Sequence, residues 1–519
     1  MLAGSWLPHI DNVTAHYGIV AKHILTTSEW ITLVRPDRPL WIQDKPPLTI
    51  WLIALSLRVF GDSHFALRFW HVLMTLALVY VTYRFARLHA GRETSLLAAL
   101  LLATSLAVFH LTNAPQQDVP LTLFLALAFY SYVTYRTHGR PAAALLCALW
   151  VALGVLSKGL VMVVAFGPAL VVDLLIAWRR HEDVHSQWPH VALAAALFLL
   201  VALPWFVAGA LRQGAPFVRA FTIGEAGVGR FLHRFLGPGI GPRLGPLTQL
   251  FGYVPLLIVG MLPWAGLLPG VVQKARLSLV EGPPSVRVLT LYGGVLFLVL
   301  SISQGDKVLR YLLPCFPPLA VLAARALEET IDDPRGLRPA AWITLLAGIL
   351  LLVASVWLTG AQTTGIARVY LRLVTPSLVV FGAALVTFAI WIHRGRGRQA
   401  VALLAVGALV SYGLMGWAID RNWERLWPWR DIGAMVSRLY HDGDRVVMLS
   451  GPEADPDFLA YYITPAVQSV KTDDELLTAW AEGRVFGLIS PESYARLEQR
   501  LHATVLIQTP LGWRLVINR

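Results

Sequence analysis

The feature that most constrains this chain is a series of apolar blocks, each about 20 residues long, between residues 66 and 418. An apolar helix of about 20 residues spans the hydrocarbon core of a bilayer. Only 14% of the 519 residues are charged and 56% are hydrophobic, whereas about 25% of the residues of a soluble domain are charged. We therefore expect an α-helical polytopic membrane protein.

Twelve blocks are counted as membrane spans, of which the fourth is short. Their approximate limits are 66–88, 94–112, 119–136, 142–157, 160–178, 191–211, 248–270, 286–304, 311–327, 340–360, 372–392 and 400–418. An even number of spans places the N-terminal segment and the C-terminal tail on the same side. Alternate loops each hold at least two Lys or Arg residues, and the positive-inside rule then places both ends of the chain outside.

Two segments outside the spans have their own character. Residues 11–65 form an outer loop with two interfacial helices: residues 48–60 are apolar but too short to span, and an earlier stretch has a single apolar face formed by Val13, Tyr17, Val20 and Ile24. Near residue 420 the composition changes to that of a small soluble α/β domain. Its strands are predicted at 445–450, 485–489, 504–508 and 513–517, and its helices at 430–441, 456–463, 473–482 and 491–501. The predicted domains are thus 1–419 in the membrane and 420–519 outside.

Ionisable side chains stand at the outer mouths of these spans, where they are costly and usually mark a site. Asp11 opens the outer loop, where a carboxylate can take a proton from an acceptor hydroxyl. Asp118 lies at a later outer junction. It is interpreted as a helix N-cap or as a group that orients the acceptor or a cation near Asp11, and the two interpretations are compatible.

Several cations lie on the same predicted side. Asp44 and Lys45 form either a surface ion pair or a contact for a phosphate, which a fixed cation would stabilise as its negative charge grows. Lys158 is either a lysine that snorkels to the interface or a second phosphate contact. Lys307, Arg310 and Tyr311 anchor a helix end or contact the same phosphate.

Other functional classes are not supported by the sequence. It contains no Walker loop, no nucleotide-binding glycine motif after a strand, no GxSxG and no Cys/His spacing typical of a metal site. Cys147 and Cys315 both lie in apolar blocks, and no disulfide is predicted. The net charge of +12 is attributed to positive-inside topology and anionic lipid rather than to nucleic acid.

The outer motifs together resemble those of the GT-C membrane glycosyltransferases. The motifs are the acid Asp11, the stretch 44–48 (Asp-Lys-Pro-Pro-Leu) before an apolar helix that contains Trp, and the later acid Asp118. The most similar branch contains the lipid A aminoarabinose transferase and the bacterial relatives of dolichyl-phosphate-mannose–protein mannosyltransferases. The resemblance runs from Asp11 to about Pro318, and a small outer C-terminal domain also fits that branch.

The resemblance implies an inverting transfer of a sugar from a polyprenyl-phosphate carrier to lipid A, a glycan or a protein hydroxyl. The reaction would take place on the outer face of the bacterial inner membrane, and the enzyme would be a monomer. Asp11 and Asp118 match the family's acids, and the donor phosphate would be bound by Lys45, Lys158, Lys307, Arg310 and Tyr311. Substrate positioning falls to Asp44 and, in a lid loop over 212–247, to Glu225 and Arg230.

The sequence also departs from the family pattern. Asn12 stands where a second acid is common, which weakens the case for a metal at that pair. A divalent cation near Asp11 and Asp118 is the only cofactor left open. The family has a helix before this acid, so thirteen spans and an incomplete start of the chain are expected.

Two alternatives remain at this point. A transporter or lipid flippase would need ionisable residues near the midplane and paired broken helices. The acids here lie near span ends, apart from Asp173. A structural membrane subunit that presents the C-terminal domain to a partner would leave residues 44–47 unexplained. The transferase is therefore the leading prediction.

Overall fold

The computed structural model describes residues 12–36, 45–182, 187–222, 250–303, 307–331, 334–360, 365–449 and 455–518. Within these ranges, ten helical segments are long and apolar enough to cross a membrane, or twelve if each of two bent pairs is one span. The ten are α3 (His64–Ala86), α6 (Asp118–His138), α7 (Pro141–Lys158), α8 (Val161–Arg179), α9 (Trp188–Gln213), α15 (Pro284–Ile302), η3 with α16 (Leu309–Cys315 and Phe316–Thr330), α17 (Pro334–Gly360), α18 (Gly365–His393) and α19 (Gly397–Leu426). The predicted polytopic helical fold is confirmed.

The spans expose large apolar side chains on their outer surfaces. Leu200 of α9 and Val356 of α17 are each 72% exposed. Contiguous apolar surface of this kind is rare on a soluble monomer, whereas lipid tails solvate it. The surface therefore fits the membrane location that the hydropathy predicts.

At two predicted spans, 94–112 and 248–270, the structure has a bent pair of helices in place of one straight helix. The first is a bent pair, α4 (Arg92–Ala103) and α5 (Leu106–Asn113), with an angle of 54°. The second bends by 116° between α13 (Tyr253–Gly260) and the continuous segment of η2 (Trp264–Leu267) and α14 (Leu268–Val280). Pro263 precedes η2 and has no N–H to continue the ladder of α13.

The two breaks satisfy each other's polar groups. The Leu106 N–H donates to the Leu262 carbonyl at 2.8 Å, and Trp264 Nε1 donates to Thr104 Oγ1 at 2.8 Å. The Tyr412 hydroxyl, from α19, donates to the Thr104 carbonyl at 3.1 Å. A break at membrane depth requires such partners because lipid offers none.

A buried charge network ties neighbouring ends of α6, α8 and α15. Asp173 is 0% exposed and accepts hydrogen bonds from Arg136, Arg287 and the Tyr132 hydroxyl. Both arginines also pair with Glu182. The one acid that the sequence places away from the span ends is thus neutralised within a helix-joining cluster.

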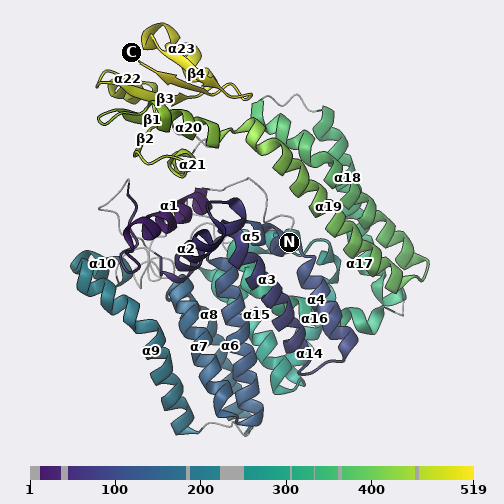
Figure 1. The fold of residues 1–519 in the computed structure, drawn as a ribbon. Helices are drawn as coiled ribbons and strands as arrows, with labels where there is room; N and C mark the ends of the chain where they lie inside the picture. The colour runs from purple at the N-terminus through teal and green to yellow at the C-terminus, as the bar shows by residue number, and fades with distance from the viewer. Residues whose placement is uncertain are drawn as a thin grey trace.

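Two short helices lie between the spans and the C-terminal domain (Figure 1). They are α1 (Asn12–Thr27) and α2 (Leu48–Phe60), as the sequence predicts. Tyr17, Val20 and Ile24 of the predicted apolar face of α1 are buried. Hydrogen bonds from Trp51 Nε1 to the Trp30 carbonyl at 2.7 Å and from Trp205 Nε1 to the Ile31 carbonyl at 3.2 Å fix the segment after α1 to α2 and α9.

The C-terminal domain contains a five-stranded mixed sheet with strand order β2-β1-β3-β5-β4. Strand β1 is parallel to β2 and β3, and β5 is antiparallel to β3 and β4. The strands are β1 (Arg445–Leu449), β2 (Val467–Val470), β3 (Val485–Ile489), β4 (Thr504–Gln508) and β5 (Arg514–Ile517), and the helices are α20 (Trp429–Leu439), α21 (Pro456–Ala460), α22 (Asp473–Trp480) and α23 (Pro491–Leu501). Four strands match the prediction. Strand β2 was missed because it is a four-residue edge strand with an exposed polar centre.

Candidate active site

The loop between α5 and α6 is held against α3 by two side chains. Arg68 Nε donates to the Asn113 carbonyl at 2.9 Å, and His71 Nε2 donates to the Gln116 carbonyl at 2.7 Å. Arg68 and His71 are each 1% exposed. Sequence reasoning missed both residues, although an Arg and a His at the start of an apolar span were a usable signal.

Asp118 and Lys158 form an ion pair at one end of the bundle. Asp118 is the first residue of α6 and Lys158 is the last residue of α7. The side chains are only 5% and 13% exposed, respectively. Gln117 occupies the N-cap position of α6, and its side chain makes no capping hydrogen bond. The carboxylate of Asp118 therefore does not cap the helix and pairs with Lys158. Two residues predicted separately are thus brought into one contact.

Arg310 and Tyr311 join this pair from η3. Arg310 Nη1 donates to Gln116 Oε1 at 3.0 Å. The Tyr311 ring centroid lies 5.0 Å from Lys158 Nζ and 5.3 Å from Arg310 Cζ. Asp118 acts electrostatically on Arg310. Among the described residues of this cluster, Lys158 and Arg310 carry two positive charges and Asp118 carries one negative charge. The excess of one positive charge suits an anionic ligand.

The helix α1 is also linked to this cluster. Helix α1 packs on α2, and α2 packs on α7, the helix that ends at Lys158. The buried amide nitrogen of Gln117, next to Asp118, has no hydrogen-bond partner among the described residues. A buried donor without a partner costs free energy, so a ligand that accepts from it would relieve that cost.

The contacts of Lys307 favour the anchoring interpretation. Its Nζ donates to the carbonyls of Leu300, Ser301 and Ser303 at 3.0, 3.1 and 2.6 Å. These carbonyls lie at the C-terminal end of α15, where a cation complements the helix dipole. The phosphate role predicted for Lys307 stays a prediction.

Lys45 is half-buried and is followed by two buried prolines, Pro46 and Pro47, and then by α2. Helix α2 contacts α7, the helix that ends at Lys158. Four other predicted site residues lie outside the described residues, so their roles stay predictions: Asp11, Asp44, Glu225 and Arg230.

An apolar cavity of about 300 Å³ lies beside Lys158. It is formed by the turn between α7 and α8, by α9 and by α10 (Ala215–Thr222). Its lining residues, all apolar except the last, are Val155, Gly159, Leu160, Phe206, Ala210, Phe217, Val218, Phe221 and Thr222. A hydrocarbon chain fits such a lining. In the sequence, the only sign of this cavity was a weak one, namely the aromatic residues in the predicted lid loop.

Within the described ranges, no group of three or more His, Cys, Asp or Glu residues is placed to hold a metal ion. The carboxylate of Asp118 is already paired with Lys158. The divalent cation left open near Asp11 and Asp118 stays a prediction because residue 11 is not among the described residues.

Comparisons with known proteins agree with the predicted resemblance. Residues 44–207 match the family model described as dolichyl-phosphate-mannose-protein mannosyltransferase. The chain is 28% identical over 459 residues to the undecaprenyl phosphate-alpha-4-amino-4-deoxy-L-arabinose arabinosyl transferase of Enterobacter sp. (strain 638), covering 85% of this chain and 74% of the relative. The enzyme of the same name from Edwardsiella ictaluri (strain 93-146) is 28% identical, covering 77% and 71%.

Solved structures show the same fold. The crystal structure of ArnT from Cupriavidus metallidurans bound to undecaprenyl phosphate has a TM-score of 0.79 at 18% identity and covers 100% of this chain and 95% of that chain. The oligosaccharyltransferase of Archaeoglobus fulgidus in the apo form has a TM-score of 0.52 at 12% identity, covering 89% and 61%.

Proposed function

Because the chain is a GT-C membrane glycosyltransferase related to the aminoarabinose transferases and the protein mannosyltransferases, we propose that it transfers a sugar from a polyprenyl-phosphate carrier with inversion. The observation that carries this proposal is the cluster of Lys158, Arg310 and Tyr311 around Asp118 at one end of the bundle. The relatives' own donor, undecaprenyl phosphate-linked 4-amino-4-deoxy-L-arabinose, is the first donor to test here.

In the proposed reaction, the acceptor hydroxyl oxygen attacks the anomeric carbon on the face opposite the phosphate. The new carbon–oxygen bond forms as the bond to the phosphate oxygen breaks, and both electrons of the broken bond stay with the leaving polyprenyl phosphate. The proton of the acceptor passes to the carboxylate of Asp11. Aspartate is a weak base at neutral pH, so this transfer takes place late.

The chain's cations stabilise the leaving group. Polyprenyl phosphate gains a negative charge as it departs, and fixed cations are most useful where charge develops. Lys158 and Arg310 supply the excess positive charge, and Asp118 holds the Lys158 ammonium in place. Lys45 is assigned a further phosphate contact because it precedes α2, which packs on α7.

The carrier's hydrocarbon chain would lie in the apolar cavity beside Lys158. The cavity borders the turn that directly follows this lysine, so a lipid with its phosphate at Lys158 could place its first isoprene units there. The loop over 212–247, with Glu225 and Arg230, is proposed as a lid, with Asp44 as a positioning group.

We place this site and the domain over 420–519 on the outer face of the inner membrane. The loop charges support this orientation through the positive-inside rule. The acceptor is a lipid, a glycan or a protein hydroxyl. Mass spectrometry of envelope lipids and glycans with and without the gene identifies it.

The proposal is tested by Asp11→Asn in membranes supplied with the donor. Transfer should be abolished at unchanged protein abundance because the amide cannot take the acceptor's proton. Asp442→Asn makes the same change in an exposed turn and should be silent. Lys45→Ala should chiefly raise the KM for the donor. Full activity of the Asp11→Asn chain would remove Asp11 as the base.

A further inference from the structure

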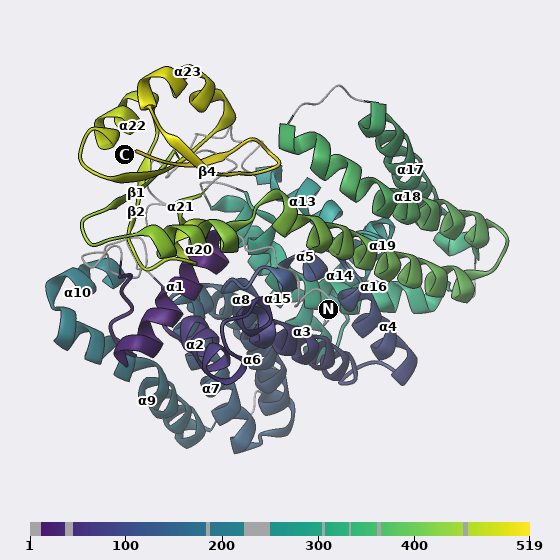
Figure 2. The ribbon, with the colours of Figure 1, turned by 45° about the horizontal axis from the view of Figure 1, so that its top comes forward.

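The C-terminal domain packs directly on α1, the helix that follows Asp11 in the sequence. Helix α1 contacts α21, and Figures 1 and 2 both show the C-terminal domain at the end of the molecule where α1 lies. One hydrophobic core joins the two parts, from Ala15, Val20 and Ile24 in α1 to Trp429 and Leu459 in the domain. The domain is therefore built into the outer layer and is not a separate body tethered by α19.

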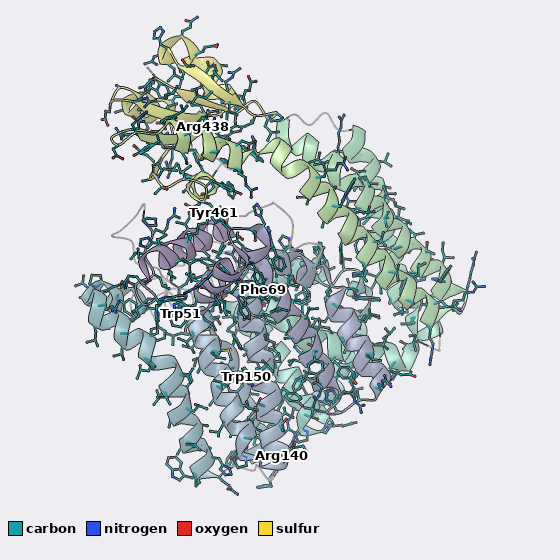
Figure 3. The ribbon with its side chains drawn as sticks, in the orientation of Figure 1. Trp51, Phe69, Arg140, Trp150, Arg438 and Tyr461 are labelled. Carbon is teal, nitrogen blue, oxygen red and sulfur yellow. The ribbon has the colours of Figure 1, made fainter. Side chains whose placement is uncertain are left out.

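One joint between them is centred on Tyr461, just after α21 (Figure 3). Lys22 of α1 lies 3.5 Å from the Tyr461 ring centroid and donates to the Tyr461 carbonyl at 3.0 Å. Asp62, in the turn between α2 and α3, pairs with Lys22 at 2.7 Å and accepts from the Tyr461 hydroxyl at 2.6 Å. The joint thus fixes α1, the α2–α3 turn and the domain relative to one another.

The Tyr461 ring lies so close to the backbone of α1 that the position facing it suits a glycine. A Cβ on Gly18 would lie 2.5 Å from Cε2 of Tyr461 and 3.3 Å from Cδ2 of Leu67 in α3. The Tyr461 ring is 5% exposed, and its hydroxyl is bonded to Asp62. An added methyl group must therefore displace the ring and disturb the joint between α1 and the domain.

A second joint lies around Asp457 of α21. Arg35 Nη1 donates to Asp457 Oδ1 at 2.7 Å and to His16 Nδ1 at 2.8 Å, and Arg35 is 1% exposed. Burial raises the pKa of Asp457, but the neighbouring His16 and Arg35 outweigh burial and leave the pKa below its usual value. The aspartate is thus held ionised against α1.

We propose that the C-terminal domain is a positioning element of the active site and acts through α1, with Tyr461, Lys22 and Asp457 as positioning residues. Helix α1 packs on α2, which packs on α7, the helix that ends at Lys158, and the first residue of α1 is bonded to Asp11. A displacement of α1 would therefore affect both the phosphate cations and the proposed base. This inference rests on the proposed function and concerns catalytic geometry, so it should lower kcat more than it raises the KM for the donor.

The test is Gly18→Ala in the full chain in lipid nanodiscs. We expect kcat to fall at least tenfold, the donor KM to change less than threefold, and amide exchange in residues 12–27 to become at least tenfold faster. Gly413→Ala, at a helical glycine with nothing near its Cβ, should change neither. Tyr461→Leu should itself lower kcat because it removes the joint, and adding Gly18→Ala to it should cost nothing further because the clash is gone.

The possible results distinguish a failure of this positioning role from a failure of the proposed transferase function. Faster exchange in α1 with unchanged kcat would overturn the positioning role and leave the transferase intact. Unchanged exchange in the Gly18→Ala chain would also overturn it. If Gly18→Ala does not fold, Tyr461→Leu alone, which adds no atom, carries the same expectation and the same refutation. A wild-type chain that transfers no sugar would remove the proposed function and this inference together.

Discussion

Substitution of Lys158 by Met tests the cation at the centre of the site. The change keeps the apolar stem of the side chain and deletes the ammonium. Asp118 then remains only 5% exposed without its lysine partner. Removing one member of a buried pair costs about 3–5 kcal/mol of folding free energy because the other charge is left uncompensated. A loss of stability by itself would therefore not reveal a catalytic role.

The double variant Lys158→Met/Asp118→Asn separates the two effects. It removes both charges, so most of the lost stability should return. Transfer should not return because the donor phosphate still lacks this cation. Loss of one group that stabilises developing charge lowers kcat by about 10²–10³, or about 2.7–4 kcal/mol. We expect a stable and nearly inactive protein.

The assay is sugar transfer by purified protein in nanodiscs, with kcat and KM measured beside denaturant unfolding. Lys274→Met is the matched control. It breaks a pair with Glu329, whose side chain is 59% exposed, and should cost no more than about 1 kcal/mol with kcat unchanged. If the double variant recovered kcat along with stability, Lys158 would be only a structural partner of Asp118, and the reasoning would be refuted.

Two further predictions concern Asp173 and His89, which lie away from the candidate site. Asp173→Asn deprives Arg136 and Arg287 of a shared partner. The free energy of unfolding should therefore fall by about 3–5 kcal/mol, while kcat per folded molecule stays constant. A specific loss of kcat would show that the network contributes to catalysis. Burial and the nearby charge of Arg325 lower the pKa of His89 from 6.5 to about 4. As the pH falls, the unfolded state therefore binds a proton on His89 before the folded state does. This difference should lower the free energy of unfolding of the wild type by roughly 2–3 kcal/mol between pH 7 and 4.5. His89→Gln should lose correspondingly less over that range in unfolding experiments, and equal losses would contradict the burial argument.

Much of the fold was predictable because hydropathy and period are local properties of the sequence. The apolar blocks gave the spans, and alternating apolar runs gave β1, β3, β4 and β5. The bends were not predictable in this way. The breaks beside Thr104 and Pro263 are stable because each supplies partners to the other and to Tyr412, and such pairing across the fold leaves no trace in a hydropathy window.

The candidate site was predictable as a set of residue types at one side of the membrane. Asp118, Lys158, Arg310 and Tyr311 were each singled out from a position at a span end. Their contacts depend on which helix ends meet, so the sequence could not say that Asp118 would pair with Lys158. It also could not decide between the two interpretations of Lys307, whose contacts are helix carbonyls.

By itself, the sequence determined that this chain lies in a membrane and where its ionisable groups stand along the spans, because the cost of placing polar groups in lipid acts on each residue separately. Only the tertiary structure decided which of those groups touch, and that a glycine in α1 lets the C-terminal domain pack on the helix that follows Asp11. Such contacts join residues hundreds of positions apart, and their free energy depends on distances of a few ångströms that packing alone fixes.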